Sequence, residues 1–346
     1  MRLAAAAGAA IAAAALGAAL SNTSGVPTWN FQMALAAVRA RNAGVNLAGR
    51  TAVVVGGTSG IGRGVAVRLA KANASVTIVG RDEQRAQEVL ADLARVGGSG
   101  SHTFARVDGS SIASTKDFSK AFLASQPTVD VLVLTHGIAT IQGRTETPEG
   151  LDQKLAVHYF GRMAFIAGLL PGLRASARAD TAFTPRVLTV LSAGVHGQYV
   201  HYADDFELKE HYSLKNAADA AGLYNDVAMD SLARAERSIA FAHAAPGLVA
   251  TNWGKEMPGA IRALLSLIRP FARSLLDCGE FMSEPLLRPI PKPSDEPKLI
   301  LIGQDANPAR LTGIHEAGAR WCGPRRRRCL DVSACPSEKG VERERE

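Results

Sequence analysis

Aromatic residues and paired cysteines are scarce in this chain of 346 residues. Phe, Trp and Tyr make up 5% of the sequence, and so few rings offer little surface for stacking the bases of single-stranded nucleic acid. The four cysteines are Cys278 and three residues of the C-terminal tail, Cys322, Cys329 and Cys335, without CxxC spacing. This pattern argues against a disulfide scaffold and a zinc site, and no metal ligand is predicted.

Charge is also distributed in a way that argues against a nucleic-acid partner. The net charge is +7, but the one dense basic run, Arg325 to Arg328, lies in a tail without apolar periodicity. We therefore expect residues 306–346 to be a solvated, mostly disordered tail. With 47% hydrophobic residues, the rest of the chain is long enough for one large domain or two small ones.

The N-terminal extension, residues 1–46, allows two interpretations. Its first twenty residues are alanine-rich after a single arginine, the outline of a signal peptide or a weak membrane anchor. Alanine is also the best helix former, so a frayed helix fits equally well. Membrane contact is expected only if this stretch is an anchor. A short helix is predicted around Phe31 to Arg41.

The stretch from Thr51 to Arg81 predicts a nucleotide-binding βαβ unit. An apolar run, Ala52 to Val55, is followed by a loop with three key glycines, Gly56, Gly60 and Gly62. The spacing then becomes helical, and Ser75 to Val79 forms a second strand. Gly56 allows a tight turn, Gly60 lets the backbone approach a pyrophosphate, and Gly62 lets the helix pack closely. The N-terminus of the helix would bind the phosphates, and the loop residues Thr58, Ser59 and Ile61 are included in the predicted cofactor site.

The residue after the second strand favours NADP over NAD. A NAD site usually carries a carboxylate there to hold the ribose 2′-hydroxyl, and this chain has Arg81, with Arg63 in the first helical turn. Guanidinium groups suit a 2′-phosphate. Asp82 stands one residue later and keeps NAD open as the alternative.

Strands and helices continue to alternate along residues 47–305, which predicts one α/β domain of the Rossmann type with a doubly wound parallel sheet. The expected strands include His102 to Val107, Ile239 to His243 and Lys298 to Ile302, with long helices at Leu151 to Leu173 and Asn216 to Ser238. Ligands bind at the carboxyl ends of such strands. Those ends carry Gly56, Arg81, Asp108, His136, Ser192 and Pro246. Residues 256–297 are expected to form a small substrate lid.

These residues resemble the short-chain dehydrogenase/reductase family, over about Leu47 to Gly303. The resemblance is carried by the glycine loop, by Asp108 and Ser192, and by a Pro-Gly-Leu-Val-Ala-Thr motif that begins at Pro246. It is strongest to a fungal-type branch. The resemblance implies that Asp108 contacts the adenine, that Val249 and Thr251 contact the nicotinamide carboxamide, and that Ser192 binds the substrate oxygen. The cofactor site so implied also includes His136, Gly137 and Gly247.

The chain departs from the family at the Tyr-x-x-x-Lys pair that moves the proton. If Tyr224 is the proton donor, the lysine position holds Ala228. In the other register the tyrosine position is Gly222 and the lysine position is Asp226. The family's helical asparagine corresponds to His158. That residue or Lys215 could replace the missing positive charge.

The predicted function is hydride transfer between NADP(H) and a carbonyl or secondary alcohol of a small molecule, with Ser192 and Tyr224 as catalytic residues. The alternative is a nucleotide-binding sensor or scaffold without redox turnover. A homodimer through the two long helices is plausible. NADP use and the absence of disulfide pairing favour the cytoplasm.

Overall fold

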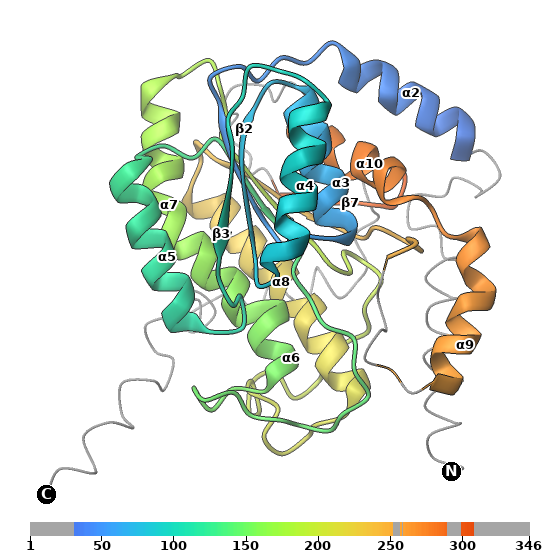
Figure 1. Cartoon of the computed structure of the whole chain (residues 1–346). Coiled ribbons are helices and arrows are strands. Elements are labelled where there is room, and N and C mark those ends of the chain that lie inside the picture. Colours follow the sequence, from blue (N-terminus) through green and yellow to red (C-terminus); the bar gives the residue numbers. More distant parts are fainter. Residues whose placement is uncertain (1–30, 252–256, 258, 289–298, 308–346) are drawn as a thin grey trace, which may run out of the picture.

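A seven-stranded parallel sheet forms the centre of the computed structural model, which describes residues 31–251, 257, 259–288 and 299–307 (Figure 1). Its strands are β1 (Thr51–Val55), β2 (Ser75–Gly80), β3 (His102–Arg106), β4 (Val131–Leu134), β5 (Arg186–Val190), β6 (Ala240–Ala244) and β7 (Leu299–Ile302). They lie in the order β3-β2-β1-β4-β5-β6-β7 and pair in parallel throughout. The order reverses between β1 and β4, which is where such folds bind ligands. The predicted Rossmann architecture is confirmed.

Helices cover both faces of this sheet. On one side lie α3 (Gly60–Lys71), α4 (Glu83–Arg95) and α10 (Leu275–Leu287). On the other lie α5 (Ile112–Ser125), α7 (Gly161–Ala179) and α8 (Leu214–Ala235) (Figure 1). Apolar side chains of β1 lie on both faces of the sheet, and helices bury both faces. Val53 and Val55 belong to the core beneath α7 and α8, whereas Val54 belongs to the core beneath α3 and α10. Strands buried on both faces read as continuous apolar runs.

Side-chain oxygens fix where several helices begin. Asp82 accepts a hydrogen bond from Arg85 N at the start of α4, Ser111 caps α5, and Ser213 caps α8 through Asn216 N. Each cap satisfies a backbone amide that the first helical turn leaves unpaired. α3 is different, because its N-cap Ser59 makes no side-chain hydrogen bond.

The long helix predicted over Leu151 to Leu173 is divided in the structure. A short α6 (Gln153–Leu155) leads into a π-helical turn (Ala156–Phe160), and α7 follows. Such turns concentrate at functional sites, and this one holds His158. The apolar residues that a dimer interface could have used, Tyr159, Met163 and Phe165, are buried in the core beneath the sheet. The homodimer stays a prediction.

The domain begins earlier than predicted. Helix α2 (Phe31–Ala43) is docked on the sheet's helical layer: Asn42 is buried and donates to Glu280 of α10, and Arg68 of α3 donates to Asn42 O. Residues 31–46 therefore belong to the folded unit, which corrects the predicted boundary at residue 47. The alanine-rich stretch and the basic tail lie outside the described residues. Among the helices that the structure describes, none is both long and apolar enough to span a membrane.

The second half of the predicted lid forms helix α10. This helix is largely buried, and it crosses α3 so closely that a Cβ atom at Gly279 would lie 2.8 Å from Gly64 Cα. The contact holds α10 against a core helix, and the lid role of residues 256–297 stays a prediction. Of the described part of the predicted lid, only α9 (Gly259–Ile268) and the turn after it lie outside this contact. The proline run after Leu287 lies outside the described residues.

Candidate functional site

The glycine loop between β1 and α3 has the geometry of a phosphate cradle. Gly56 and Gly60 both adopt positive φ, at 80° and 54°, which an L side chain rarely tolerates. A Cβ atom at Gly62 would lie 2.5 Å from the Thr135 hydroxyl and 2.8 Å from Gly56 C, so this glycine allows α3 to approach the strand. The first amide to bond back along α3 is that of Arg63, to Ser59 O. The preceding amides and the helix dipole therefore face the loop.

The loop after β6 closes over this cradle. A Cβ atom at Gly60 would lie 3.2 Å from the methyl group of Thr251, so residues almost two hundred positions apart are in contact range. Thr251 N donates to Val249 O at 2.7 Å, and Val249 forms a β-bridge with Arg273. Gly247, next to Pro246, has a φ of 69° and packs against Gln304. The structure thus brings the two predicted ends of the cofactor site together.

The two predicted arginines differ in what they contact. Arg63 is engaged in an ion pair with Asp92 of α4, and its Nε donates at 2.9 Å. Arg81 is exposed at the end of β2. The carboxylate of Asp82 is committed to capping α4 and to an ion pair with Arg85 at 3.1 Å. Asp82 therefore has a structural role, which leaves Arg81 as the cation beyond the second strand.

Two half-buried histidines face each other here, His136 after β4 and His158 on the π-helical turn, and both have a lowered pKa. Burial first, then Arg162, His158 and Arg81, lower the pKa of His136 well below its ordinary value. Burial first, then Arg162 and Lys154, lower that of His158 to about 3. His158 Nε2 accepts from Ile138 N at 3.1 Å. Within the described part of the chain, both ring nitrogens of His136 are buried without a hydrogen-bond partner. A neutral His158 cannot supply the positive charge that the missing lysine would have carried.

Other parts of the predicted cofactor site lie around His136. A Cβ atom at Gly109 would lie 2.8 Å from its ring, and one at Gly137 would lie 2.9 Å from His158 Nε2. Asp108 is exposed and accepts from Ser110 N and Oγ at 3.0 and 2.7 Å. Thr58 is buried against Gly80, which leaves Ser59 and Ile61 at the mouth of the cradle.

Arg162 of α7 is a buried cation that the sequence reasoning missed. Its guanidinium donates to His136 O at 2.7 Å, to Val190 O at 3.0 Å and to the Thr189 hydroxyl at 2.5 Å. It therefore ties the end of β4 to the end of β5. Burial lowers its pKa to about 9, so it remains charged at neutral pH. Only its position inside the fold, not a sequence motif, reveals this role.

Ser192 stands where the resemblance places it, two residues after β5. Its hydroxyl is buried and, among the described residues, has no hydrogen-bond partner. Its backbone amide donates to His243 Nε2 of β6 at 3.2 Å. The hydroxyl is thus available to a substrate while the backbone is held in place.

Tyr224 lies in the aromatic core. Its exposed fraction is 1%, its ring stacks on Phe206 at 4.3 Å between centroids, and its hydroxyl donates to Phe206 O at 3.1 Å. Tyr159 packs edge-on against it at 5.3 Å. These are the contacts of a structural side chain, so the geometry does not support the predicted catalytic role.

Lys215 is also accounted for by a structural contact. It is largely exposed and pairs with Asp219 at 2.5 Å, four residues along α8. Pairs of this spacing are ordinary on exposed helix faces. Asp219 in turn accepts from Gly197 N at 2.7 Å, on the loop after Ser192.

A buried chain of three side chains adjoins Ser192, and the sequence reasoning did not assemble it. His196 Nε2 lies 2.6 Å from one oxygen of Asp226, and His243 Nδ1 bonds the other oxygen of the same carboxylate. The side chains of His196 and Asp226 are each 2% exposed. His196 precedes α8 by a long loop, so no sequence spacing could have placed it on Asp226.

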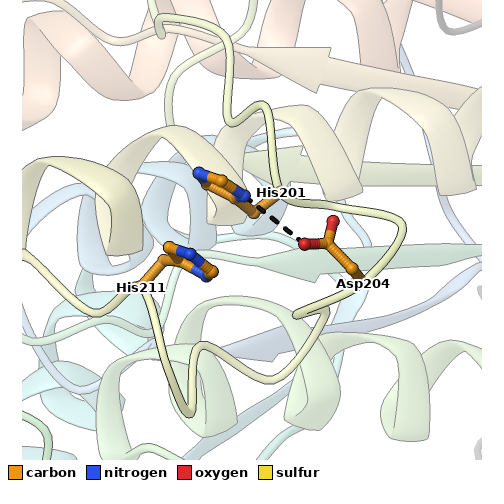
Figure 2. A group of neighbouring side chains, drawn as sticks. All are labelled: His201, Asp204 and His211. Atoms are coloured by element: carbon orange, nitrogen blue, oxygen red, sulfur yellow. Dashed lines mark ion pairs between the residues drawn. The ribbon is translucent and has the colours of Figure 1, made fainter.

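Two further histidines lie on the loop between β5 and α8 (Figure 2). The rings of His201 and His211 stack at 3.6 Å and 5°, and His201 Nδ1 is 3.5 Å from Asp204. Donor atoms of the three residues lie within 4.8 Å of one another. Zinc takes such ligands through lone pairs in the ring plane, and one cation cannot lie in the planes of both stacked rings. The arrangement shown is a stacking contact, which one ring would have to leave to bind a metal ion.

The chain is similar in sequence to known proteins. A model of the short chain dehydrogenase family matches residues 50–194. Oxidoreductase AN1596 of Emericella nidulans is 34% identical over 254 residues, which cover 72% of this chain and 74% of that protein. The chain belongs to the short-chain dehydrogenase family. Polyprenol dehydrogenase of Mus musculus is 36% identical over 156 residues, 45% of this chain and 46% of that protein.

Solved structures of short-chain dehydrogenases share the fold. The RhlG/NADP complex of Pseudomonas aeruginosa superposes with a TM-score of 0.55 at 21% identity, covering 78% of this chain and 98% of that one. An alcohol dehydrogenase of Thermococcus sibiricus complexed with 5-hydroxy-NADP gives 0.55 at 18% identity, covering 76% and 99%. The protein is thus an NAD(P)-binding Rossmann protein of an oxidoreductase family. In this member of the family, neither register of the usual tyrosine and lysine keeps the pair: one holds Tyr224 and Ala228, and the other holds Gly222 and Asp226.

Proposed function

We propose that this protein is an NADP-dependent oxidoreductase that transfers a hydride between NADP(H) and a carbonyl or secondary alcohol of a small organic molecule. The observation that carries the proposal is the Ser192 hydroxyl, which is buried without a partner in the described part of the chain. A buried hydroxyl that lacks a hydrogen bond costs about 1–3 kcal/mol. A substrate oxygen would remove that cost.

The residues of the cradle fit a dinucleotide. Side chains at Gly56, Gly60 or Gly62 would close the space next to the N-terminus of α3. Both ring nitrogens of His136 are buried, and no described residue offers them a hydrogen-bond partner. Gly60, Ile61 and Gly62 would hold the phosphates, Asp108 the adenine side, and Val249 and Thr251 the nicotinamide carboxamide. When bound, the nicotinamide ring supplies or accepts the hydride.

Arg81 supports NADP as the cofactor. It is exposed beyond β2, while the acid that follows it, Asp82, caps α4. A guanidinium forms charge-assisted hydrogen bonds to a phosphate. Two structural neighbours are complexed with NADP or an NADP derivative, and another is complexed with NAD.

A titration of NADPH fluorescence tests the cofactor assignment. Arg81→Ala is expected to weaken NADPH binding about tenfold, the equivalent of about 1.4 kcal/mol, and to leave NADH binding unchanged. Arg95→Ala, at the far end of α4 and paired with Asp92, is the control and should bind both cofactors like the wild type. Equal losses for NADPH and NADH would contradict a 2′-phosphate contact.

A second candidate function is a nucleotide-binding protein without redox turnover, and the core position of Tyr224 favours it. Oxidation of NADPH by acetophenone, hexanal and phenanthrenequinone separates the two. The oxidoreductase should turn over at least one of these probes, and Ser192→Ala should lower kcat about 100-fold or more at unchanged NADPH affinity. Tight NADPH binding with no turnover of any carbonyl would favour the silent nucleotide-binding protein.

A further inference from the structure

The histidine chain beside Ser192 occupies the place where a short-chain dehydrogenase would need its proton donor. Gly222 and Asp226 are four residues apart and share one face of α8, whereas Tyr224 is rotated about 200° from Gly222. A Cβ atom at Gly222 would lie 2.5 Å from the His196 ring. The imidazole therefore fills the volume that a side chain at Gly222 would take, and it bonds to the side chain one turn later.

The local backbone brings His196 there. Val195 N donates to Ser192 O at 3.0 Å, and Gly194 has a φ of 68°. This tight turn reverses the chain directly after Ser192, so that His196 returns toward α8. Gly222 in turn has to be a glycine, because any larger residue would collide with the ring. The loop and the helix are complementary at this point.

Hydrogen bonds define the protonation of each ring. His243 Nε2 accepts from Ser192 N, so its proton is on Nδ1, facing Asp226. His196 has Asp226 at Nε2 and the Gly197 carbonyl, 3.0 Å away, at Nδ1. Both of these atoms are acceptors for the ring of His196. An imidazolium at His196, a carboxylate at Asp226 and a neutral imidazole at His243 therefore satisfy all of these hydrogen bonds.

The charges around the chain agree with this assignment. Burial disfavours the charged form of His196, but the hydrogen bond and charge of Asp226, with Asp219 also on α8, raise its pKa above the ordinary value. Burial lowers the pKa of His243 on β6 although Asp226 opposes the shift, and His196 and Arg162 of α7 lower it further. The charge of Asp226 thus stabilises one additional proton, and that proton is on His196, not on His243.

We propose that His196, seated over Gly222 and paired with Asp226, is the proton donor and acceptor of this site in place of the family's tyrosine and lysine. The inference rests on the proposed oxidoreductase function. Asp226 and His243 are positioning residues, since they orient and charge the imidazole and hold the backbone of Ser192. The neighbouring charge has the opposite effect to that in the family. There a lysine lowers the pKa of a tyrosine, whereas here a carboxylate raises the pKa of an imidazole and keeps it protonated.

The reduction balances with these groups. The substrate oxygen takes the place of the Gly197 carbonyl at His196 Nδ1, and the Ser192 hydroxyl donates to the same oxygen. As the carbonyl carbon gains a hydride from the reduced nicotinamide, the oxygen forms a bond to the Nδ1 proton. The N–H electron pair stays on nitrogen, which leaves a neutral imidazole that regains a proton from water. Oxidation of the alcohol runs through the reverse steps.

Three variants of the full chain test the proposal. His196→Gln should bind NADPH with wild-type affinity and lose at least about 100-fold in kcat with phenanthrenequinone, within the range for a general acid. Gly222→Ala keeps the histidine but displaces its ring, and should show the same split between kcat and NADPH affinity. His201→Gln is the matched control, because His201 stacks on His211 and lies outside the chain; it should behave as the wild type.

An NMR titration of the histidine ring signals measures the protonation of His196 in the absence of substrate. The signal that disappears in His196→Gln should titrate above pH 6.5 in the wild-type protein, and Asp226→Asn should move it below that value. In wild type, kcat for reduction should fall as pH rises through the same titration. A purely structural His196 would lose stability on substitution without any link between this titration and kcat.

Failure of the inference and failure of the function are distinguishable. An active wild type with an equally active His196→Gln variant, or a His196 that is neutral at pH 7, overturns the inference and leaves the oxidoreductase intact. A wild type that binds NADPH but reduces no carbonyl overturns both. If His196→Gln does not fold, the split between kcat and NADPH affinity in Gly222→Ala decides the matter.

Discussion

Replacing Gly279 with alanine is expected to destabilise the protein, although alanine is the better helix former. In an exposed helix interior the change would stabilise by about 1 kcal/mol. At Gly279 the new Cβ atom would lie 2.8 Å from Gly64 Cα, and backbone cannot rotate away as a side chain can. Overpacking costs about 1–3 kcal/mol, and a backbone contact belongs at the upper end. We therefore expect a net loss of about 1–2 kcal/mol.

The sign of this effect decides how α10 is placed. Urea unfolding followed by far-ultraviolet circular dichroism measures the free energy of unfolding of the wild type and the variant. Gly259→Ala, at the start of α9 where a Cβ atom meets nothing within 4 Å, is the matched control and should be neutral or slightly stabilising. A Gly279→Ala variant as stable as the wild type, or more so, would refute the close α3–α10 contact and favour α10 as part of the predicted lid.

Three more predictions concern single side chains. Tyr224→Phe keeps the ring stack and loses the hydrogen bond to Phe206 O. It should lower the free energy of unfolding by about 1 kcal/mol and change kcat less than threefold. A 100-fold loss of kcat would support the predicted catalytic role of Tyr224. Arg162→Met removes the buried guanidinium and leaves three acceptors without their donor. At about 1–3 kcal/mol for each unsatisfied acceptor, the free energy of unfolding measured in urea should fall by about 3 kcal/mol or more. A loss below about 1 kcal/mol would contradict the bridging role. His158 has a folded pKa of about 3, so between about pH 6 and 4 it binds a proton in the unfolded chain but not in the folded one. The free energy of unfolding should therefore decrease by up to about 1.4 kcal/mol for each pH unit that the pH falls in this range. His158→Asn should flatten that slope, and an unchanged slope would show that His158 is not held neutral.

Much of the cofactor side could be predicted from the sequence because its determinants are local. Gly56, Gly60 and Gly62 lie within seven residues, and each is required by the backbone of one turn. Buried strands such as Ala52 to Val55 can be recognised in the sequence as continuous apolar runs. The carboxyl ends of parallel strands lie at one edge of the sheet, so the order of elements alone placed Asp108, His136 and Ser192 near one another.

Helix boundaries and the lid were less predictable, because packing decided them. The proline-rich stretch after α10 suggested a loose lid, yet Gly64 and Gly279, more than two hundred residues apart, let α10 dock against α3. Neither glycine is distinctive in the sequence. Helix α2 likewise joins the domain through Asn42 and Arg68, whose contact depends on the folded positions of α2 and α3.

The sequence by itself determined the Rossmann fold, the nucleotide cradle, the family and the loss of the Tyr-x-x-x-Lys pair, because each depends on residues close together in the chain. Only the tertiary structure decided what stands in that pair's place. Asp226 faces two histidines from different segments, one on β6 and one on a loop after β5. This contact could not be predicted from sequence spacing, because the three residues come from separate segments. Proximity in the folded chain and the cost of an unpaired buried charge determine which residues contact such a carboxylate.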